Sequence, residues 1–203
     1  MQKINDKINN MDNKKSVEMK KIIVLMAVLV LVIGASVAEE RMFPLFTLDD
    51  LSGNRIELNS LLNKDKPIII TFWATWCKPC KRELRKLYEY WENWDTTKGE
   101  RQYIIIALCE DGPRSKRQAL ALAKKEGWDN FIIPYDDGQK IKKKAGVADI
   151  PELFILKPDG TIFYRHIGFN PGDEKKTIAK LEELIEKIGK TKENIIPEEK
   201  SDK

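Results

Sequence analysis

The chain has 203 residues and a formal net charge of +4; 42% of its residues are hydrophobic and 33% are charged. This balance is typical of a globular protein with enough apolar residues for one core, and three cysteines are too few for a disulfide-rich scaffold. The lysines are interleaved with Asp and Glu rather than gathered into one basic stripe, so the composition argues against binding to nucleic acid.

The N-terminus has the three parts of an export signal. Residues 1–21 are polar and end in Lys20 and Lys21, which directly precede an uncharged aliphatic run, Ile22–Ala38, with small residues at its end. This run is slightly long for a cleaved signal peptide and at the short limit for a transmembrane anchor, so both remain open. Lysines before an apolar segment keep the N-terminal end of that segment in the cytoplasm. We therefore expect the chain after Ala38 to lie outside the cytoplasm, either in the periplasm or on the outer face of the inner membrane.

The next segment, residues 42–67, predicts a β-hairpin followed by a short helix. A first short strand leads to a turn at residues 52–54, and a second strand runs through Ile56 and Leu58. Ser60 is expected to cap the short helix.

Strands and helices then alternate, which predicts one α/β domain over residues 39–189, with a parallel first half and a final antiparallel hairpin. Apolar runs predict strands at residues 67–73, 103–109, 131–135, 152–157 and 161–168. Helical periodicity and helix-stop residues predict helices at residues 77–94, 114–127, 137–147 and 173–189. Residues 190–203 read as a charged C-terminal tail.

The stretch "FWATWCKPCKREL" places Cys77 and Cys80 three positions apart, directly after a predicted buried strand. A structural zinc site would need four ligands, and beyond this pair the chain offers only Cys109 and His166. Attachment of haem through a C-x-x-C-H run fails because Lys81 follows the second cysteine. A purely structural disulfide remains open, although so short a loop contributes less stabilisation than a long one.

A redox couple explains more of these residues. Cys77 lies where a strand gives way to a helix, so the first free N–H groups of the helix stabilise its thiolate and lower the pKa of the thiol. Lys78 adds a positive charge, and Pro79 fits the first helical turn because no N–H is needed there. Cys80, one turn further on, suits the resolving role in thiol–disulfide exchange. This chemistry requires no metal and no cofactor.

Two motifs together resemble the thioredoxin superfamily, in particular exported, membrane-tethered thioredoxin-like proteins of the TlpA/ResA kind. They are "FWATWCKPCKREL" and "GVADIPELFILKPDG", and the resemblance runs from Phe43 to Ile188. It implies a thioredoxin-like α/β fold with a central mixed sheet flanked by helices and an N-terminal β-hairpin extension. It also implies a redox-active disulfide between the two cysteines and a cis-proline, Pro151, facing them. The backbone of Ile150 would then be free to pair with an extended client segment.

The resemblance implies roles for further residues, and the sequence departs from the family pattern at two positions. Thioredoxins proper have a buried Asp where this chain has Thr71, whereas the TlpA/ResA kind has a Glu at the position of Glu83. If partly buried, Glu83 would have a raised pKa and could exchange a proton with the resolving thiol; the alternative is a solvated helix residue. Many relatives have Thr after the cis-proline and this chain has Glu152, which is expected to alter client preference. Trp76 is expected to pack and to form an apolar rim that clients touch.

The remaining candidates receive structural roles. Trp73 is expected to be a packing residue, Cys109 to behave as a small buried hydrophobe, and His166 to be a surface or packing residue rather than a base.

The resemblance implies an extracytoplasmic thiol–disulfide oxidoreductase that reduces protein disulfides, with apocytochrome c among the client classes and a membrane partner as electron donor. Two alternatives come from other classes. A peroxiredoxin-like peroxide reductase would have Thr and Pro where this chain has Ala74 and Ile70. A tethered binding module without turnover would not need both cysteines.

Overall fold

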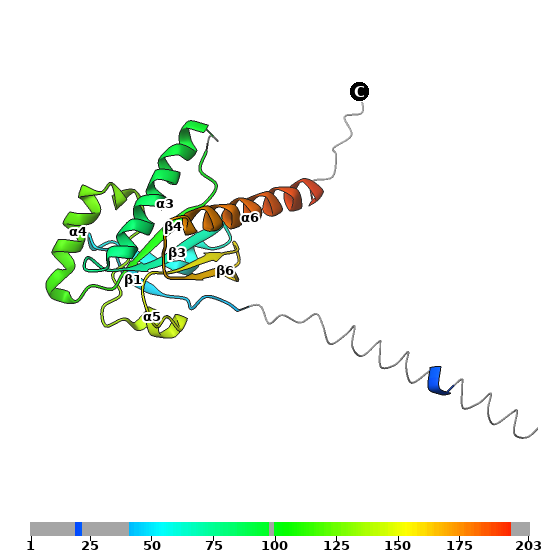
Figure 1. The fold of residues 1–203 in the computed structure, drawn as a ribbon, viewed down its shortest axis with the longest axis horizontal. Coiled ribbons are helices and arrows are strands. Elements are labelled where there is room, and N and C mark those ends of the chain that lie inside the picture. The colour runs from blue at the N-terminus through cyan, green and yellow to red at the C-terminus, as the bar shows by residue number, and fades with distance from the viewer. Residues whose placement is uncertain (1–18, 22–40, 98–99, 196–203) are drawn as a thin grey trace, which may run out of the picture. The chain divides into compact units, whose positions relative to one another are not determined.

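A four-stranded mixed sheet organises the chain from Arg41 onward in this computed structural model, which describes residues 19–21, 41–97 and 100–195 (Figure 1). The strands are β3 (Ile68–Trp73), β4 (Ile104–Cys109), β5 (Glu152–Leu156) and β6 (Ile162–Ile167), in the order β4-β3-β5-β6. β3 and β4 are parallel, whereas the β3–β5 and β5–β6 pairs are antiparallel. This confirms the predicted mixed sheet with a final hairpin.

Alternation along β3 explains why this strand is central. Ile69 and Trp73 point into the core on one face of the sheet, while Ile68, Ile70 and Phe72 point into the core on the other. Every residue of β3 is buried, as expected for a strand covered on both faces.

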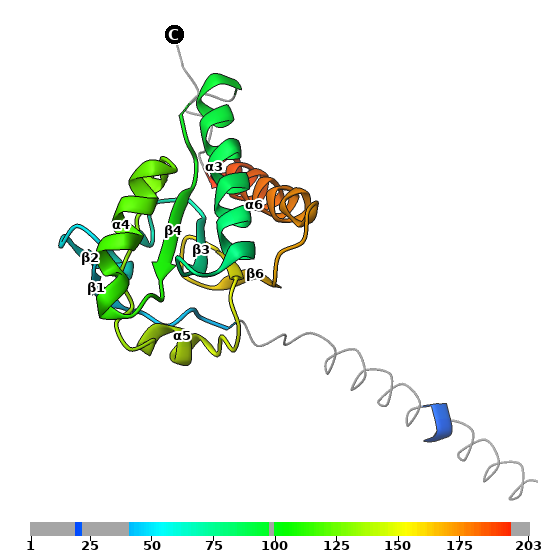
Figure 2. The same cartoon turned by 60° about the vertical axis from the view of Figure 1, so that its left-hand side comes forward.

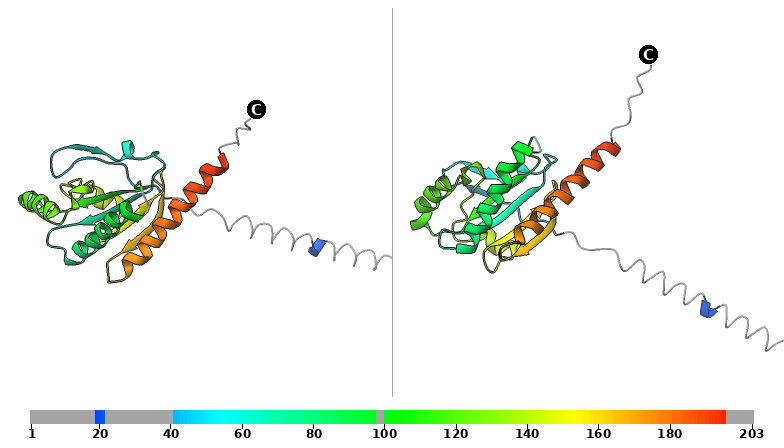
Figure 3. Two further views of the ribbon diagram at one scale, coloured as in Figure 1. Left: turned by 90° about the horizontal axis from the view of Figure 1, so that it is seen from above. Right: turned by 45° about the horizontal axis from the view of Figure 1, so that its top comes forward.

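Helices cover the first face, and the N-terminal hairpin with a short helix covers the second. Core residues on the first face come from the helices α3 (Lys78–Thr97), α4 (Lys116–Lys125) and α6 (Asp173–Ile195). The elements over the second face are β1 (Thr47–Asp49), β2 (Arg55–Glu57), α2 (Leu58–Leu61) and α5 (Lys140–Ala145). Figure 2 shows α3 and α5 on opposite sides of the sheet, and Figure 3 shows α6 running alongside α3. Two 3-10 turns flank α4, at Pro113–Ser115 and Trp128–Asn130.

The N-terminal hairpin is present, but its predicted end is wrong. Leu58 begins α2 instead of continuing the second strand, and its N–H donates to the carbonyl of Phe46. Ser60 lies inside this one-turn helix, where its hydroxyl donates to the carbonyl of Glu57, so it does not cap the helix.

Two other expectations differ in extent. Residues 131–135 make isolated bridges instead of a strand: Ile132 and Tyr135 bridge in parallel to β4, and Pro134 bridges antiparallel to Asp50. A continuous ladder with β4 does not form because Pro134 has no N–H to donate. Helix α6 continues to Ile195 and so includes the first residues of the predicted tail. None of the described helices has the length and apolar character of a membrane span, and the predicted export segment Ile22–Ala38 lies outside the described residues.

Candidate active site

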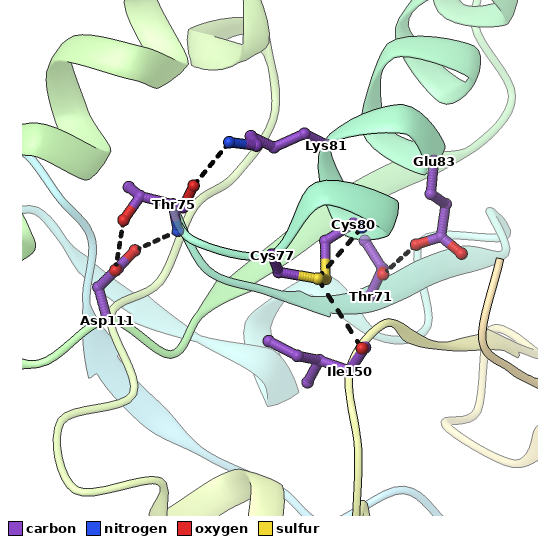
Figure 4. Close-up of a disulfide and its surroundings, with 8 residues drawn as sticks. All are labelled: Thr71, Thr75, Cys77, Cys80, Lys81, Glu83, Asp111 and Ile150. Carbon is purple, nitrogen blue, oxygen red and sulfur yellow. Dashed lines mark hydrogen bonds between the residues drawn. A yellow bond between two sulfur atoms is a disulfide. The ribbon is translucent and has the colours of Figure 1, made fainter.

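The two cysteines of the C-x-x-C motif lie at the start of α3, four residues after β3 ends. Cys77 and Cys80 are joined in a disulfide, with their Cα atoms 5.4 Å apart (Figure 4). Cys77 is 4% exposed and Cys80 is fully buried, so Cys77 is the less deeply buried of the two residues.

The start of α3 provides the expected electrostatic environment for Cys77. The backbone N–H of Cys80 donates a hydrogen bond to the sulfur of Cys77 at 3.2 Å, so a free N–H group of the first helical turn points at this atom. Lys78 is exposed and Pro79 half-buried within the same turn. In the reduced form, the N-terminus of α3 favours a negative charge on the Cys77 sulfur more than Lys78 does, because solvent screens the charge of an exposed lysine.

The loop before β5 forms the opposite wall of the site. The Ile150–Pro151 peptide bond is cis, as the resemblance implied, and the Ile150 carbonyl oxygen lies 3.8 Å from the sulfur of Cys77. Figure 4 shows this carbonyl directed at the disulfide from the segment that leads into β5. Trp76 is 67% exposed, so the expectation that it packs into the core is wrong. Its role in an apolar rim that clients touch stays a prediction.

Glu83 is buried rather than solvated. Its side chain is 4% exposed and accepts a hydrogen bond of 2.5 Å from the hydroxyl of Thr71 on β3. Burial raises the pKa of Glu83 to about 8; the bond from Thr71 opposes this effect, and the negative charge of Asp173 adds to it. Glu83 follows Cys80 by three residues on α3, so a carboxyl group with a raised pKa occupies the helical turn after this cysteine.

A second carboxylate, Asp111, fixes the loop that precedes Cys77. Its side chain is 2% exposed and accepts hydrogen bonds from both the backbone N–H and the hydroxyl of Thr75, at 2.8 and 2.7 Å. The ammonium group of Lys81 donates to the carbonyl of Thr75 at 2.8 Å, which closes the loop from the other side (Figure 4). The sequence alone did not point to Asp111 or to Lys81 as residues that hold this loop. The available signal was an acidic pair, Glu110 and Asp111, directly after a buried strand that ends at the same edge of the sheet as β3.

Among the remaining predicted or ionisable residues, only Cys109 contacts this arrangement, through Asp111, within the part of the chain that the structure describes. Trp73 is fully buried, as predicted. Cys109 is also fully buried, with its sulfur 3.5 Å from a carboxylate oxygen of Asp111, and burial raises the pKa of its thiol strongly. His166 is half-buried and stacks on Tyr164, which fits the packing role. Glu110 is 4% exposed and makes no side-chain hydrogen bond among the described residues; burial raises its pKa to about 8.

A C-x-x-C disulfide at a strand-to-helix junction, faced by a cis-proline on a mixed sheet, defines a thioredoxin-like redox centre. Solved structures share this fold. A thioredoxin-like protein from Porphyromonas gingivalis is 33% identical with a TM-score of 0.59, and the match covers 71% of this chain and 92% of that one. A DsbE-type thiol:disulfide interchange protein from Chlorobium tepidum has a TM-score of 0.62 at 19% identity, covering 74% and 99% of the two chains.

Sequence relatives narrow the class. Residues 40–165 match the model of the AhpC/TSA family, and the chain belongs to this family. Thiol-disulfide oxidoreductase ResA of Bacillus thuringiensis (strain Al Hakam) is 31% identical over 145 residues, which cover 71% of this chain and 75% of that protein. Thiol:disulfide interchange protein DsbE of Vibrio cholerae is 29% identical over 160 residues, covering 74% and 77%. The predicted enzyme class, a thiol–disulfide oxidoreductase, is confirmed.

Proposed function

We propose that this chain reduces disulfide bonds of polypeptide clients outside the cytoplasm, with Cys77 as the nucleophile and Cys80 as the resolving thiol. The observation that carries this proposal is the position of the Cys77 sulfur. It accepts the Cys80 N–H at the start of α3 and faces the carbonyl of Ile150. An extended client segment placed against Ile150 and the cis-proline would bring its disulfide to this sulfur.

The reaction is a two-electron exchange in two steps. The Cys77 thiolate attacks one sulfur of the client disulfide, which forms a mixed disulfide and releases the other client sulfur as a thiolate. The Cys80 thiolate then attacks the sulfur of Cys77, closing the enzyme disulfide and releasing the second client thiolate. The client gains two electrons, and the protons of the two enzyme thiols balance its new thiols.

Glu83 is proposed to handle the proton of the resolving thiol. A carboxyl group whose pKa is about 8 is a mixture of protonated and ionised forms near neutral pH, so it can accept the Cys80 proton as the thiolate forms. It can return that proton when the enzyme disulfide is reduced again. Its hydrogen bond from Thr71 holds the carboxyl group in one orientation during both steps.

The proposal also covers the direction of electron transfer, the clients, the electron donor and the location of the chain. Reduction in an oxidising compartment needs an electron source, for which we propose a membrane partner supplied from the cytoplasm. Disulfides in apocytochrome c are the proposed client class. The predicted segment Ile22–Ala38 would export or tether the chain, and mass spectrometry of the native N-terminus would distinguish cleavage from retention.

Reduction of insulin by dithiothreitol with catalytic amounts of the full chain tests the proposed activity. The Cys77→Ser variant should lose catalysis, whereas Cys109→Ala, altered at a buried position on β4, should retain it. Cys80→Ser should accumulate a mixed disulfide with the client. Retained catalysis in the Cys77→Ser variant would contradict the assignment. An equilibrium with glutathione gives the reduction potential: a value far below that of the compartment supports a reductant, and one above it an oxidant.

A further inference from the structure

Glu152, the residue after the cis-proline, carries a buried charge directly beside the segment that faces the disulfide. Its side chain is 1% exposed. A buried carboxylate is costly unless a charged partner compensates it. Here the partner is Arg165 on the neighbouring strand β6, whose Nε hydrogen-bonds and ion-pairs with the Glu152 carboxylate.

Arg165 makes a second hydrogen bond, to the backbone at the end of α5. Its Nη2 donates to the carbonyl of Gly146 at 3.1 Å, and its guanidinium carbon lies 5.4 Å from the ring centre of Phe154. Gly146 ends helix α5 in a left-handed conformation with φ of 70°. One side chain therefore joins β5, β6 and the end of α5, and the planar fork of a guanidinium makes these two bonds possible together.

These contacts fix both ends of the short segment that faces the disulfide. Arg165 holds Gly146 at one end, and at the other the carbonyl of Pro151 accepts a hydrogen bond of 2.8 Å from the Gly168 N–H. Residues 147–150 span the distance between these anchors. The last of them, Ile150, presents its carbonyl to the sulfur of Cys77.

We propose that Glu152 and Arg165 are positioning residues that hold this segment in the place required by polypeptide clients, and so set the preference of the enzyme for protein over small disulfides. The inference rests on the proposed function. An extended client pairs with the wall formed by residues 146–151, so a displaced wall weakens its alignment with the reacting sulfur. A small disulfide needs only access to Cys77. A buried ion pair is often no more stabilising than an apolar pair, so fixing the geometry is the better explanation for a charge here.

The test compares two substrates in single-turnover reactions of the pre-reduced full chain. Stopped-flow measurements give second-order rate constants with insulin and with the small aromatic disulfide 5,5′-dithiobis(2-nitrobenzoate). Arg165→Met should lower the insulin rate constant by about tenfold or more, while the small-disulfide rate constant stays within about twofold. Arg165→Lys should give an intermediate loss, because one ammonium group does not reproduce both bonds of the guanidinium. Arg55→Met, on exposed β2, is the matched control and should change neither rate.

A double variant keeps the test decisive if an unpaired Glu152 unfolds the protein. Glu152→Thr combined with Arg165→Met leaves no unpaired buried charge, and urea unfolding verifies that it folds. Because the two residues act as a unit, the insulin rate constant of the double variant should be lowered about as much as that of Glu152→Thr alone, or of Arg165→Met where it folds, and not by the product of the two single effects. Equal losses with both substrates, no loss with either, or multiplying losses would overturn the inference. Failure of the proposed function is distinguishable, because the unaltered chain would then not reduce insulin at all.

Discussion

Replacing Glu83 with Gln should remove a large part of the pH dependence of the stability of this protein. The folded chain holds the Glu83 carboxyl group with a pKa of about 8, against 4.5 in the unfolded chain. Between these values the folded state keeps a proton that the unfolded state has released, so the free energy of unfolding falls as the pH rises. Below about pH 4.5 the group is protonated in both states, and above about pH 8 the full loss is reached.

The size of this effect follows from the two pKa values. The interval between 4.5 and about 8, at about 1.4 kcal/mol for each pH unit, corresponds to a loss on the order of 5 kcal/mol. Glu110 is raised to about 8 by burial and by the charge of Asp136, and it adds a loss of the same sign. Glu83→Gln should therefore abolish a large part of the decline while keeping an oxygen that accepts the Thr71 hydrogen bond.

Urea unfolding of the oxidised chain at pH 5, 7 and 9 measures this difference. The free energy of unfolding should decline across the series in the unaltered chain and decline by several kcal/mol less in Glu83→Gln. Glu89→Gln, at an exposed position on the same helix, is the matched control and should keep the full decline. Parallel pH profiles for the unaltered chain and Glu83→Gln would refute the reasoning, because they would mean that Glu83 ionises as easily in the folded chain as in water.

Three further predictions concern the reaction and the loop before it. Glu83→Gln should slow thiol–disulfide exchange and remove its dependence on a group that titrates near pH 8; unchanged kinetics would return Glu83 to a structural role. Thr75→Val should destabilise the chain by about 1–3 kcal/mol, because it leaves an oxygen of the buried Asp111 without its partner, and should slow insulin reduction, whereas Thr75→Ser should preserve both. Loss of stability without any change in rate would contradict a role for this loop in the reaction. Hydrogen peroxide should not be consumed faster with the chain and dithiothreitol than with dithiothreitol alone; rapid consumption would instead support the peroxide reductase.

The central strands and the redox motif were readable from local sequence because each depends on neighbouring residues. The apolar run ending at Trp73 predicts a strand buried on both faces, and the spacing of Cys77 and Cys80 places them in one helical turn. The cis bond before Pro151 followed from resemblance rather than from the residues themselves. The burial of Glu83 was left conditional, because charged residues surround it in the sequence and its contact with Thr71 on β3 arises only in the folded chain.

The contacts that hold the site together join residues far apart in the chain, which single-sequence patterns do not reveal. Asp111 binds Thr75 across 36 positions, and Glu152 meets Arg165 only because the hairpin register places β5 beside β6. Local sequence patterns also misplaced the start of the short helix α2. Ser60 has the residue type of a helix cap, but the backbone turns into α2 two residues before it.

Selective alkylation of the reduced chain tests the central claim most directly, that Cys77 is the reactive thiol. The fully reduced protein is treated at pH 7 with less than one equivalent of iodoacetamide, and the modified peptide is identified by mass spectrometry. The account predicts modification at Cys77, with Cys80 and the buried Cys109 left largely intact. Preferential modification of either of the other two cysteines, or equal reaction of all three, would contradict it.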